Sequence, residues 1–529
     1  MTQRTFGWRP TGPAIGFQGV PLVVGGILLL LVWFGTRHTG SAGLGFRLDD
    51  SWIHMVYGRE LAETGRLAYN RGLPATGATA PLWAGLLAVI HLLLGRISLE
   101  AVILGVYGLG AAAYLACIGL ANALTAELTG ERRFGALAAL MLALSPPMAA
   151  AAFSGMEVGL CAALLLAGLL ALARKRHGLA GLWLALASLT RPEALAVLGP
   201  VLLVVCVTPG RTIARILRIA APAVVSSGLW IAYDIWATGH LLPATFYGKG
   251  HLALGALPDR LAVGVTGILA QIPPFWGYGA WIALLGCAWA SCRRHTLLAT
   301  WLPLLAGLGF SAANLALIAP ADPRAFYHLR YLLPAVPLLI VALGVGAAGL
   351  TRVLRPPMRA LAPILLLIWA AVGAGITVSP TSTHLHNDTR NINEVQRALG
   401  EWIAENTAPD DWIAATDAGA VRYFSRRATI DLMGLNTPEI RWVGPSWLRA
   451  HPVSAVAFMP SWLRPVRPDL QIARTFRTEG YTVTSNPKMA VQVVAVWPGD
   501  AGDAPVPVEF VGLWRTAVYC RPWRSPGAH

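Results

Sequence analysis

The sequence predicts an α-helical polytopic membrane protein, with about eleven spans plus interfacial helices, followed by a small C-terminal α/β soluble domain. Of its 529 residues, 55% are hydrophobic and 13% are charged, about half the charged fraction of an ordinary soluble domain. The 26 acidic residues are unevenly placed, with 12 before residue 379 and 14 in the last 151 residues. These observations divide the chain into a membrane domain, 1–378, and a soluble domain, 379–529.

The same figures exclude several classes of protein. The low charged fraction argues against a soluble enzyme, a disordered protein and a disulfide scaffold. The formal charge of +15 would suit a nucleic-acid binder, but a mean hydropathy of +0.57 does not. We therefore expect a lipid bilayer as a partner and no nucleic acid.

Apolar runs of the length of a bilayer span, about 20 residues, recur along the first domain. Spans are predicted at 20–37, 101–126, 134–152, 157–173, 179–190 with 194–207, 219–237, 275–292, 296–318, 331–350 and 360–378. Two shorter runs, 80–95 and 262–272, are ambiguous. If 80–95 lies in the membrane interface or re-enters the membrane, every basic cluster falls on one side, as the positive-inside rule requires. The N-terminus is then cytoplasmic, and loop 38–100 and the C-terminal domain are extracytoplasmic.

The C-terminal domain alternates helix-like and strand-like segments. A helix-like stretch at 393–406 is followed by strand-like runs at 412–416, 428–432, 454–459, 481–485 and 491–497. This alternation is typical of a small α/β domain.

The first outer loop carries two adjacent carboxylates, Asp49 and Asp50, directly before an amphipathic stretch that includes His54. A carboxylate pair near the membrane can bind a divalent cation, or can keep one member as a general base because like charges raise one pKa. The alternative is that one of them caps the helix that follows, which would account for one acid but not two.

Three further charges, Glu157, Arg191 and Glu193, lie between apolar runs on the predicted outer side. Charged groups in such places usually pair with one another or line a wet cavity. One interpretation is an ion pair between Arg191 and a glutamate that only holds helices together. The other is that the forked guanidinium of Arg191 binds a phosphate.

Cationic residues recur in two other outer loops. Lys249, one of only three lysines, stands near Tyr247, and His328 and Arg330 precede the predicted span at 331–350. A snorkelling lysine and an aromatic-belt anchor are the structural alternatives to phosphate binding. Together, on one face, these residues describe a site for an anionic headgroup beside a carboxylate pair.

At these positions the chain resembles the GT-C superfamily of integral membrane glycosyltransferases. Its members include protein O-mannosyltransferases, aminoarabinose transferases and mycobacterial arabinosyltransferases. The similar segments are LDDSWIH at 48–54, APLW at 80–83, SGME at 154–157, LTRPE at 189–193, LPATFYGK at 242–249 and RYLLP at 330–334. In the C-terminal domain, TDAGA at 416–420 and IDLMGL at 430–435 are similar to segments of uncharacterised relatives.

The resemblance implies transfer of a sugar from a polyprenyl-phosphate donor to an envelope glycan, lipid or protein acceptor on the outer face of a bacterial inner membrane. Asp49 would be the general base, and Asp50 would orient it or help bind a divalent metal. The donor phosphate would be bound by Arg191, Lys249, His328 and Arg330. His54, Glu157, Glu193 and Tyr247 would support the site.

Two other classes of protein are rivals. A transporter or lipid flippase should show repeated halves and buried charges at the bilayer midplane, and neither is clear in this sequence. A noncatalytic membrane-anchored binding protein predicts that Asp49→Asn has no effect, whereas an enzyme predicts loss of transfer.

Overall fold

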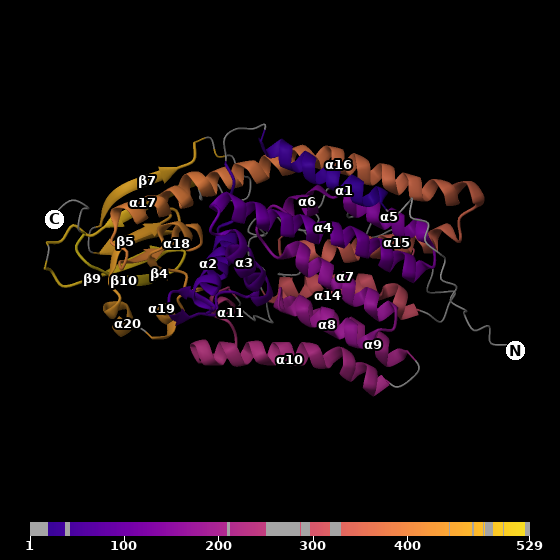
Figure 1. The fold of residues 1–529 in the computed structure, drawn as a ribbon, viewed down its shortest axis with the longest axis horizontal. Coiled ribbons are helices and arrows are strands. Elements are labelled where there is room, and N and C mark those ends of the chain that lie inside the picture. The colour runs from indigo at the N-terminus through magenta and orange to yellow at the C-terminus, as the bar shows by residue number, and fades with distance from the viewer. Residues whose placement is uncertain are drawn as a thin grey trace.

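The helical part and the C-terminal domain lie at opposite ends of an elongated molecule, with α2 and α3 between them (Figure 1). The computed structural model describes residues 19–37, 43–208, 212–249, 286, 297–317, 330–443, 445–467, 470–479, 481, 490–500 and 502–523. The helices before the C-terminal domain are α1 (Val20–Arg37), α2 (Asp49–Thr64), α3 (Pro81–Leu94), α4 (Leu99–Thr129), α5 (Arg132–Ala143), α6 (Pro146–Ala151), α7 (Val158–Ala173), α8 (His177–Ser188), α9 (Leu198–Val207), α10 (Thr212–Thr238), α11 (Ala244–Lys249), α14 (Leu297–Leu317), α15 (Val336–Thr351) and α16 (Pro356–Ile392). Short 3-10 turns, η1 (Pro192–Val197) and η4 (Leu333–Ala335), precede α9 and α15.

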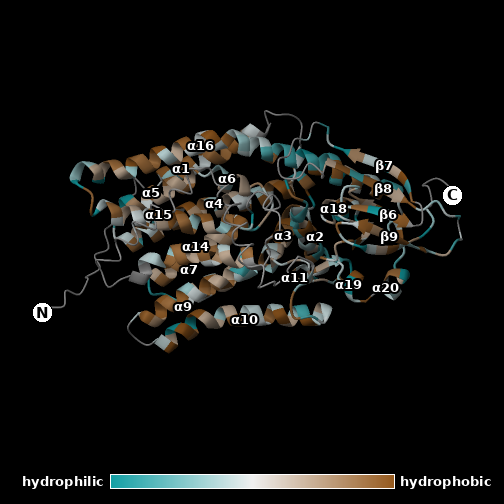
Figure 2. Ribbon diagram, turned by 180° about the vertical axis from the view of Figure 1, so that it is seen from behind, coloured by the Kyte–Doolittle hydropathy of each residue, from teal (hydrophilic) through white to brown (hydrophobic). Residues whose placement is uncertain are grey.

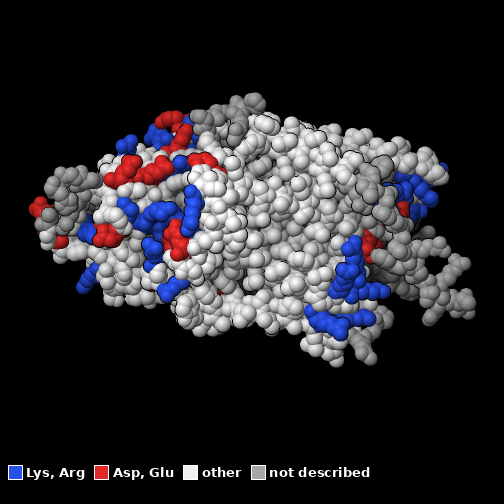
Figure 3. Space-filling view, viewed as in Figure 1, with Lys and Arg blue, Asp and Glu red and all other residues white. Residues whose placement is uncertain are grey.

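Four helical segments of the described chain are long and apolar enough to cross a membrane. They are Leu99–Thr129, Thr212–Thr238, Leu333–Thr351 and Pro356–Asn406. Figure 2 shows the helical part as mostly hydrophobic, and Figure 3 shows a broad surface without charged side chains between the two charged ends. These features are those of a polytopic membrane protein.

The predicted spans at 101–126, 219–237, 331–350 and 360–378 correspond to these four segments, the third of which begins at Leu333. The prediction of one span at 134–152 is wrong, because the helix ends at Ala143 and restarts as α6. Two prolines at 146 and 147 cause the break, since proline donates no backbone hydrogen bond and disfavours helix in the residue before it. The runs at 262–272 and, except for Gly286, 275–292 lie outside the described residues, so a count of eleven is not confirmed.

Among the described residues, basic side chains of the helical part gather at its end remote from the C-terminal domain (Figure 3). Arg174, between α7 and α8, places its Nε 3.4 Å from the Glu127 carboxylate at the end of α4. Arg352, between α15 and α16, pairs with Glu131 at the start of α5 at 3.4 Å. The loops that carry these arginines are therefore on one side, which is the arrangement used to predict the topology.

Helix α3 has 14 residues and packs along α2, which agrees with the interpretation that run 80–95 does not cross the membrane. Helix α2, expected in the interface, is instead largely enclosed, with ten of its sixteen residues buried. Its partners include α18 (Ala420–Ser425) of the C-terminal domain. The first outer loop is thus packed between the helical part and the C-terminal domain.

Helix α16 enters the C-terminal domain without a break. A π-helical turn (Asn393–Arg397) joins it to α17 (Ala398–Asn406), so the predicted helix at 393–406 is confirmed as the end of a longer one. The boundary predicted between residues 378 and 379 falls inside α16. Figure 2 shows that α16 changes from hydrophobic to hydrophilic along its length.

The C-terminal domain is built on one eight-stranded sheet. Its strands are β3 (Trp412–Ala415), β4 (Ala428–Asp431), β5 (Val453–Phe458), β6 (Leu463–Arg467), β7 (Gln471–Arg477), β8 (Val491–Val496), β9 (Val506–Gly512) and β10 (Thr516–Cys520). Strands β4, β3 and β5 are parallel, whereas β8 pairs with β5 and β7 in antiparallel fashion. Four of the five predicted strands are present as β3, β4, β5 and β8, and the run at 481–485 is described only at Tyr481. Short helices α19 (Glu439–Trp442) and α20 (Pro445–Ala450) follow β4.

Buried polar contacts join the first outer loop to this domain. The backbone N–H groups of Gly419 and Ala420 each donate to Asp49 at 2.7 Å. Asn70, in the short strand β1 (Ala68–Asn70), exchanges two hydrogen bonds with the backbone of Thr429. Further contacts are the Arg422–Glu60 pair and the bond from Arg59 to the Tyr423 carbonyl. Because unpaired buried polar groups are costly, separating the first outer loop from the C-terminal domain would destabilise both.

Gly419 allows the closest of these approaches. A Cβ atom at this position would lie 2.1 Å from the Asp49 carbonyl oxygen. We expect Gly419→Ala to reduce the free energy of unfolding by about 1–3 kcal/mol, the usual range for overpacking, and to lower the midpoint of thermal unfolding in nanodiscs. Gly375→Ala, on an open stretch of α16, is the matched control, and equal midpoints for both variants would contradict the expectation.

Candidate functional site

Two cavities meet beside Asp50. The larger, of about 460 Å³, lies between the first outer loop, the helical part and the β4–α19 turn, and the smaller, of about 140 Å³, lies between the first outer loop and the C-terminal domain. The larger is lined by Asp50, Ile53, His54, Gly77, Thr79, Met156, Glu157, Ser188, Leu189, Arg191, Pro192, Glu193, Leu195, Ala196, Ser227, Trp230, Ile231, Asp234, Leu242, Pro243, Thr245, Phe246, Ala313, Arg330, Tyr331, Leu435 and Asn436. The smaller is lined by Arg47, Leu48, Asp49, Asp50, Ile53, Arg330, Asp388, Asn391, Ile392, Thr416, Asp417, Ala418, Asp431, Met433, Leu435, Trp462 and Tyr481.

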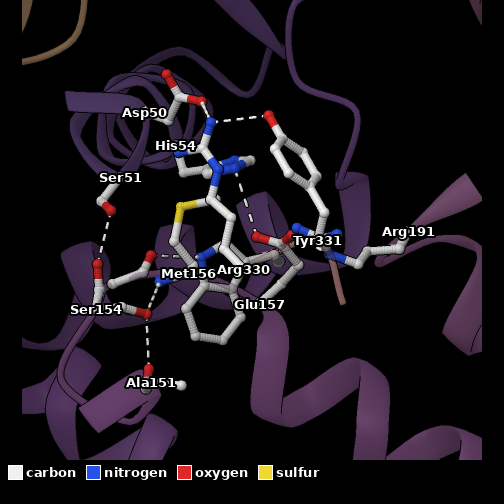
Figure 4. Close-up of polar contacts among 12 residues, drawn as sticks. Asp50, Ser51, His54, Ala151, Ser154, Met156, Glu157, Arg191, Arg330 and Tyr331 are labelled. Atoms are coloured by element: carbon white, nitrogen blue, oxygen red, sulfur yellow. Dashed lines mark hydrogen bonds and ion pairs between the residues drawn. The ribbon is translucent and has the colours of Figure 1, made fainter. Parts of the chain in front are cut away.

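Asp50 and Arg330 form an ion pair at this junction. The Arg330 Nη2 atom lies 2.6 Å from Asp50 Oδ2 and also donates to the Tyr331 hydroxyl at 2.8 Å (Figure 4). The Asp50 side chain is 31% exposed, whereas that of Arg330 is 9% exposed. The Asp50 carboxylate is therefore held in place by a buried cation and is accessible to a ligand.

Glu157 connects two other predicted residues. Its carboxylate accepts a hydrogen bond from Arg191 Nε at 2.7 Å and lies 3.6 Å from His54 Nε2 (Figure 4). All three side chains are buried. Burial lowers the pKa of His54 more than the nearby Glu157 raises it, so this histidine is neutral near pH 7.

The turn before α7 places Glu157 in the cavity. Ser51 on α2 donates to the Ser154 carbonyl at 2.6 Å, and Trp83 Nε1 donates to the Gly155 carbonyl at 3.1 Å. Gly155 has a positive φ of 73°, and a Cβ there would lie 2.6 Å from the Phe46 ring. The SGME and APLW segments are therefore one packing unit against α2.

Arg191 has donor capacity left for a ligand. In the described part of the chain its one hydrogen bond is from Nε to Glu157, which leaves the terminal guanidinium nitrogens. The Tyr331 ring lies 5.5 Å from the Arg191 guanidinium and 4.8 Å from that of Arg330. Of the two earlier interpretations, the Arg191–glutamate pair is present, and it does not use the atoms that would bind a phosphate.

Asp49 points away from the larger cavity, into the interface with the C-terminal domain. Both of its carboxylate oxygens accept backbone N–H groups at the start of α18. The alternative interpretation, in which one of the pair caps its own helix, is wrong, since the residue before α2 is Leu48 and no side chain caps that helix. Asp49 instead caps a helix that is 370 residues away in the sequence.

Asp417 lies near Asp49 and is enclosed with it. Its Oδ2 atom accepts from the side-chain amides of Gln396 at 2.8 Å and Gln492 at 2.9 Å. Burial is the main reason that the pKa of Asp417 rises to about 7. Burial and the adjacent Asp417 also raise the pKa of Asp49, but its two backbone N–H bonds oppose this rise. Both carboxyls of this enclosed pair therefore take up a proton more readily than a free carboxyl does.

The other predicted residues fall into three groups. Glu193 lines the larger cavity, and its Oε2 atom has no partner among the described residues. Tyr247 lines neither cavity and contacts Trp442 of α19 and His240, at ring distances of 5.4 and 5.6 Å. Lys249 ends α11, but its side chain lies outside the described atoms, and His328 lies outside the described residues.

Asp234 and Asn436 are two of the lining residues that were not predicted. Asp234 is the only acidic residue in the predicted span at 219–237, and an ionisable group in an apolar run is a functional signal in its own right. Asn436 follows the IDLMGL segment, in which Asp431 accepts four hydrogen bonds from residues 433–436. That turn carries Leu435 and Asn436 from the C-terminal domain into the wall of the larger cavity.

The divalent metal remains a prediction. Among the residues that the structure describes, no three His, Cys, Asp or Glu side chains form a group that could hold a metal ion.

The arrangement of helices, outer loop and C-terminal domain is the GT-C fold. In particular, the chain is similar to ArnT (aminoarabinose transferase) from Cupriavidus metallidurans in the apo state, with a TM-score of 0.55, 14% identity, and coverage of 90% of this chain and 98% of that one. The same enzyme bound to undecaprenyl phosphate gives a TM-score of 0.54, 16% identity and coverage of 92% and 98%.

A third similar structure is the Archaeoglobus fulgidus oligosaccharyltransferase in complex with Zn and sulfate. Its TM-score is 0.52, with 14% identity and coverage of 84% of this chain and 68% of that one. Residues 388–508 match a family described as a domain of unknown function, DUF8728. No curated protein matches the sequence.

The raised pKa of Asp417 predicts a pH dependence of stability. The Asp417 carboxyl binds a proton more readily in the folded protein than in the unfolded chain. Its contribution to the free energy of unfolding is therefore complete below the unfolded pKa of about 4 and is lost as the pH rises through about 7. Asp417→Asn should remove up to about 4 kcal/mol of this dependence, at about 1.36 kcal/mol per pKa unit. Thermal unfolding at pH 5, 6.5 and 8 should therefore show a midpoint that falls less steeply for the variant than for the wild type. If the midpoints of the wild type and the variant fell equally with pH, the raised pKa of Asp417 would be refuted.

Proposed function

We propose that the protein transfers a sugar from a polyprenyl-phosphate donor to an acceptor hydroxyl at the membrane surface. The observation that carries this proposal is the position of Asp50, whose carboxylate lines both cavities and is held by Arg330. A donor in one cavity and an acceptor in the other would meet at this carboxylate.

The larger cavity suits the donor. Its wall is mostly apolar, as a polyprenyl chain requires, and its charged part contains Arg191 and Arg330. When the bond between the sugar and the phosphate breaks, negative charge develops on the phosphate, and fixed guanidinium groups stabilise it. One protein of the same fold is described with undecaprenyl phosphate bound, which supports a lipid phosphate as the donor.

The smaller cavity suits a polar acceptor that approaches from the C-terminal domain. Thr416, Asp417, Trp462 and Tyr481 of that domain line it. The acceptor hydroxyl would attack the anomeric carbon, the bond to the phosphate oxygen would break, and Asp50 would take the hydroxyl proton. The products are the glycosylated acceptor and the polyprenyl phosphate.

This scheme assigns the general base to Asp50 in place of Asp49. Both oxygens of Asp49 are occupied by backbone N–H groups of α18, so it would hold the outer loop against the C-terminal domain. A lipid flippase would leave the smaller cavity beside Asp50 without a role. In the predicted topology, transfer takes place on the periplasmic face of a bacterial inner membrane, to an envelope glycan, lipid or protein.

Asp50→Asn should lower the turnover number by about 10²–10⁴-fold, because a general base contributes that much, in a folded protein in which the amide oxygen still accepts from Arg330. The measurement is transfer from radiolabelled undecaprenyl-phosphate sugars by the purified protein in nanodiscs, with membrane extract as acceptor.

Asp49→Asn is the matched variant for this experiment. It should lower the unfolding midpoint, since replacing a helix cap costs about 0.5–2 kcal/mol, and should retain more activity than Asp50→Asn. If Asp50→Asn transferred sugar at the wild-type rate, Asp50 would not be the base. If the folded wild type consumed no donor, the proposed activity would be wrong.

Arg191→Lys should weaken binding of undecaprenyl phosphate by about 10–100-fold, because a lysine offers one nitrogen and cannot contact Glu157 and a phosphate with a fork. Arg133→Lys, on an exposed arginine at the remote end, is the control. Titration of both variants in nanodiscs measures the difference, and equal affinities would exclude Arg191 from the phosphate site.

A further inference from the structure

We propose that Asp234, together with Trp230 and Thr245, recognises hydroxyl groups of the donor's sugar. The inference rests on the proposed function, because it names the part of the donor that these residues would bind. None of them is an arginine or lysine, and a carboxylate repels a phosphate, so the wall they form would face the uncharged part of the headgroup.

The first observation is a buried carboxylate without a partner. Asp234 is 0% exposed, and neither of its oxygens makes a hydrogen bond in the part of the chain that the structure describes. Burying an ionised carboxylate without compensation is strongly unfavourable. The group lies in the apolar helix α10 and lines the larger cavity. A ligand that donates hydrogen bonds would remove this penalty.

Helix α10 presents a defined face to the cavity. Ser227, Trp230, Ile231 and Asp234 follow the spacing i, i+3, i+4 and i+7, which places them on one side of the helix, and all four line the cavity. On the same helix, Leu229 is 69% exposed and Trp236 is 70% exposed. The Asp234 carboxylate therefore lies on the side of α10 that faces the cavity.

Two further polar atoms in the cavity wall are also buried without a hydrogen-bond partner among the described residues. They are Trp230 Nε1 and Thr245 Oγ1. The three residues together offer two carboxylate acceptors, an indole donor and a hydroxyl. Neighbouring hydroxyls of a sugar ring both donate and accept, so two of them could donate to the carboxylate while their oxygens accept from the tryptophan and threonine.

Contacts with the first outer loop hold this wall in place. The Tyr233 hydroxyl donates to the Leu67 carbonyl at 2.7 Å, and the Ala244 backbone N–H donates to Thr76 Oγ1 at 3.0 Å. Trp230 stacks on Tyr233 with a ring distance of 5.1 Å and an interplanar angle of 19°. A binding group supported in this way is preorganised, which reduces the entropic cost of binding.

The test compares lipid phosphates with and without a sugar. Wild-type protein in nanodiscs is titrated with undecaprenyl phosphate alone and with undecaprenyl phosphates that carry glucose, mannose, galactose or arabinose. We expect at least one sugar-bearing lipid to bind about 10–100-fold more tightly than the bare lipid, the range for hydrogen bonds to a charged group.

Asp234→Ala should remove this preference and leave the affinity for undecaprenyl phosphate within twofold. Asp234→Asn, which retains one carbonyl acceptor, should give an intermediate preference. Trp230→Phe keeps the aromatic ring and removes the donor, so it should reduce the preference in a protein that folds even if Asp234→Ala does not. Trp236→Phe, on the exposed side of α10, is the matched control and should match the wild type.

Three results would overturn the inference. They are a wild type with no preference for any sugar-bearing lipid, folded Asp234 variants with an unchanged preference, and folded Asp234 variants that lose both kinds of lipid equally. The proposed function fails by a different result, since it requires transfer. A wild type that prefers a sugar-bearing lipid through Asp234 but never transfers the sugar would leave the recognition site standing and refute the enzyme.

Discussion

The cap that Asp49 places on α18 is the contact on which the site depends. It holds the first residue of α2 against the C-terminal domain through two backbone N–H groups, and the next residue, Asp50, is thereby directed to the junction of the two cavities. Neighbouring residues in a helix point in different directions, so one carboxylate can serve the interface while the other serves the site. Gly419 is required because the approach leaves no room for a side chain.

The buried ion pair between Arg191 and Glu157 lies beside the larger cavity. Arg191 and Glu157 are 6% and 4% exposed, and a buried pair is costly to break because it leaves one uncompensated charge. The pair uses only Nε of the arginine. The same guanidinium can therefore hold α7 against the η1 turn and still present its outer nitrogens to an anion, so the structural and functional interpretations of Arg191 are compatible.

Much of the fold could be predicted from the sequence, because hydrophobic length and the placement of arginines report directly on the membrane. The long apolar runs at α4, α10, α15 and α16 were identified in this way. The break at Ser145 was missed because apolar composition continues across two prolines. Strands β6, β7, β9 and β10 were missed as well, although buried and less buried residues alternate in β9 and β10. The residue types of the site were predicted on one face, but the separate directions of Asp49 and Asp50 depend on tertiary contact with α18, which no local pattern encodes. Asp234 could have been found, since it stands alone in an apolar run.

The turn after β4 brings residues of the C-terminal domain into the wall of the larger cavity. Asp431 organises it, Gly434 adopts a positive φ of 68°, and Leu435 and Asn436 emerge in the wall of the larger cavity. The C-terminal domain therefore contributes to the wall of the larger cavity, and the two parts of the chain are not independent modules. A chimera that exchanged residues 379–529 for those of a relative would also change the wall of the larger cavity. Selection for a C-terminal domain that binds a new molecule would therefore also affect which molecules the larger cavity can bind.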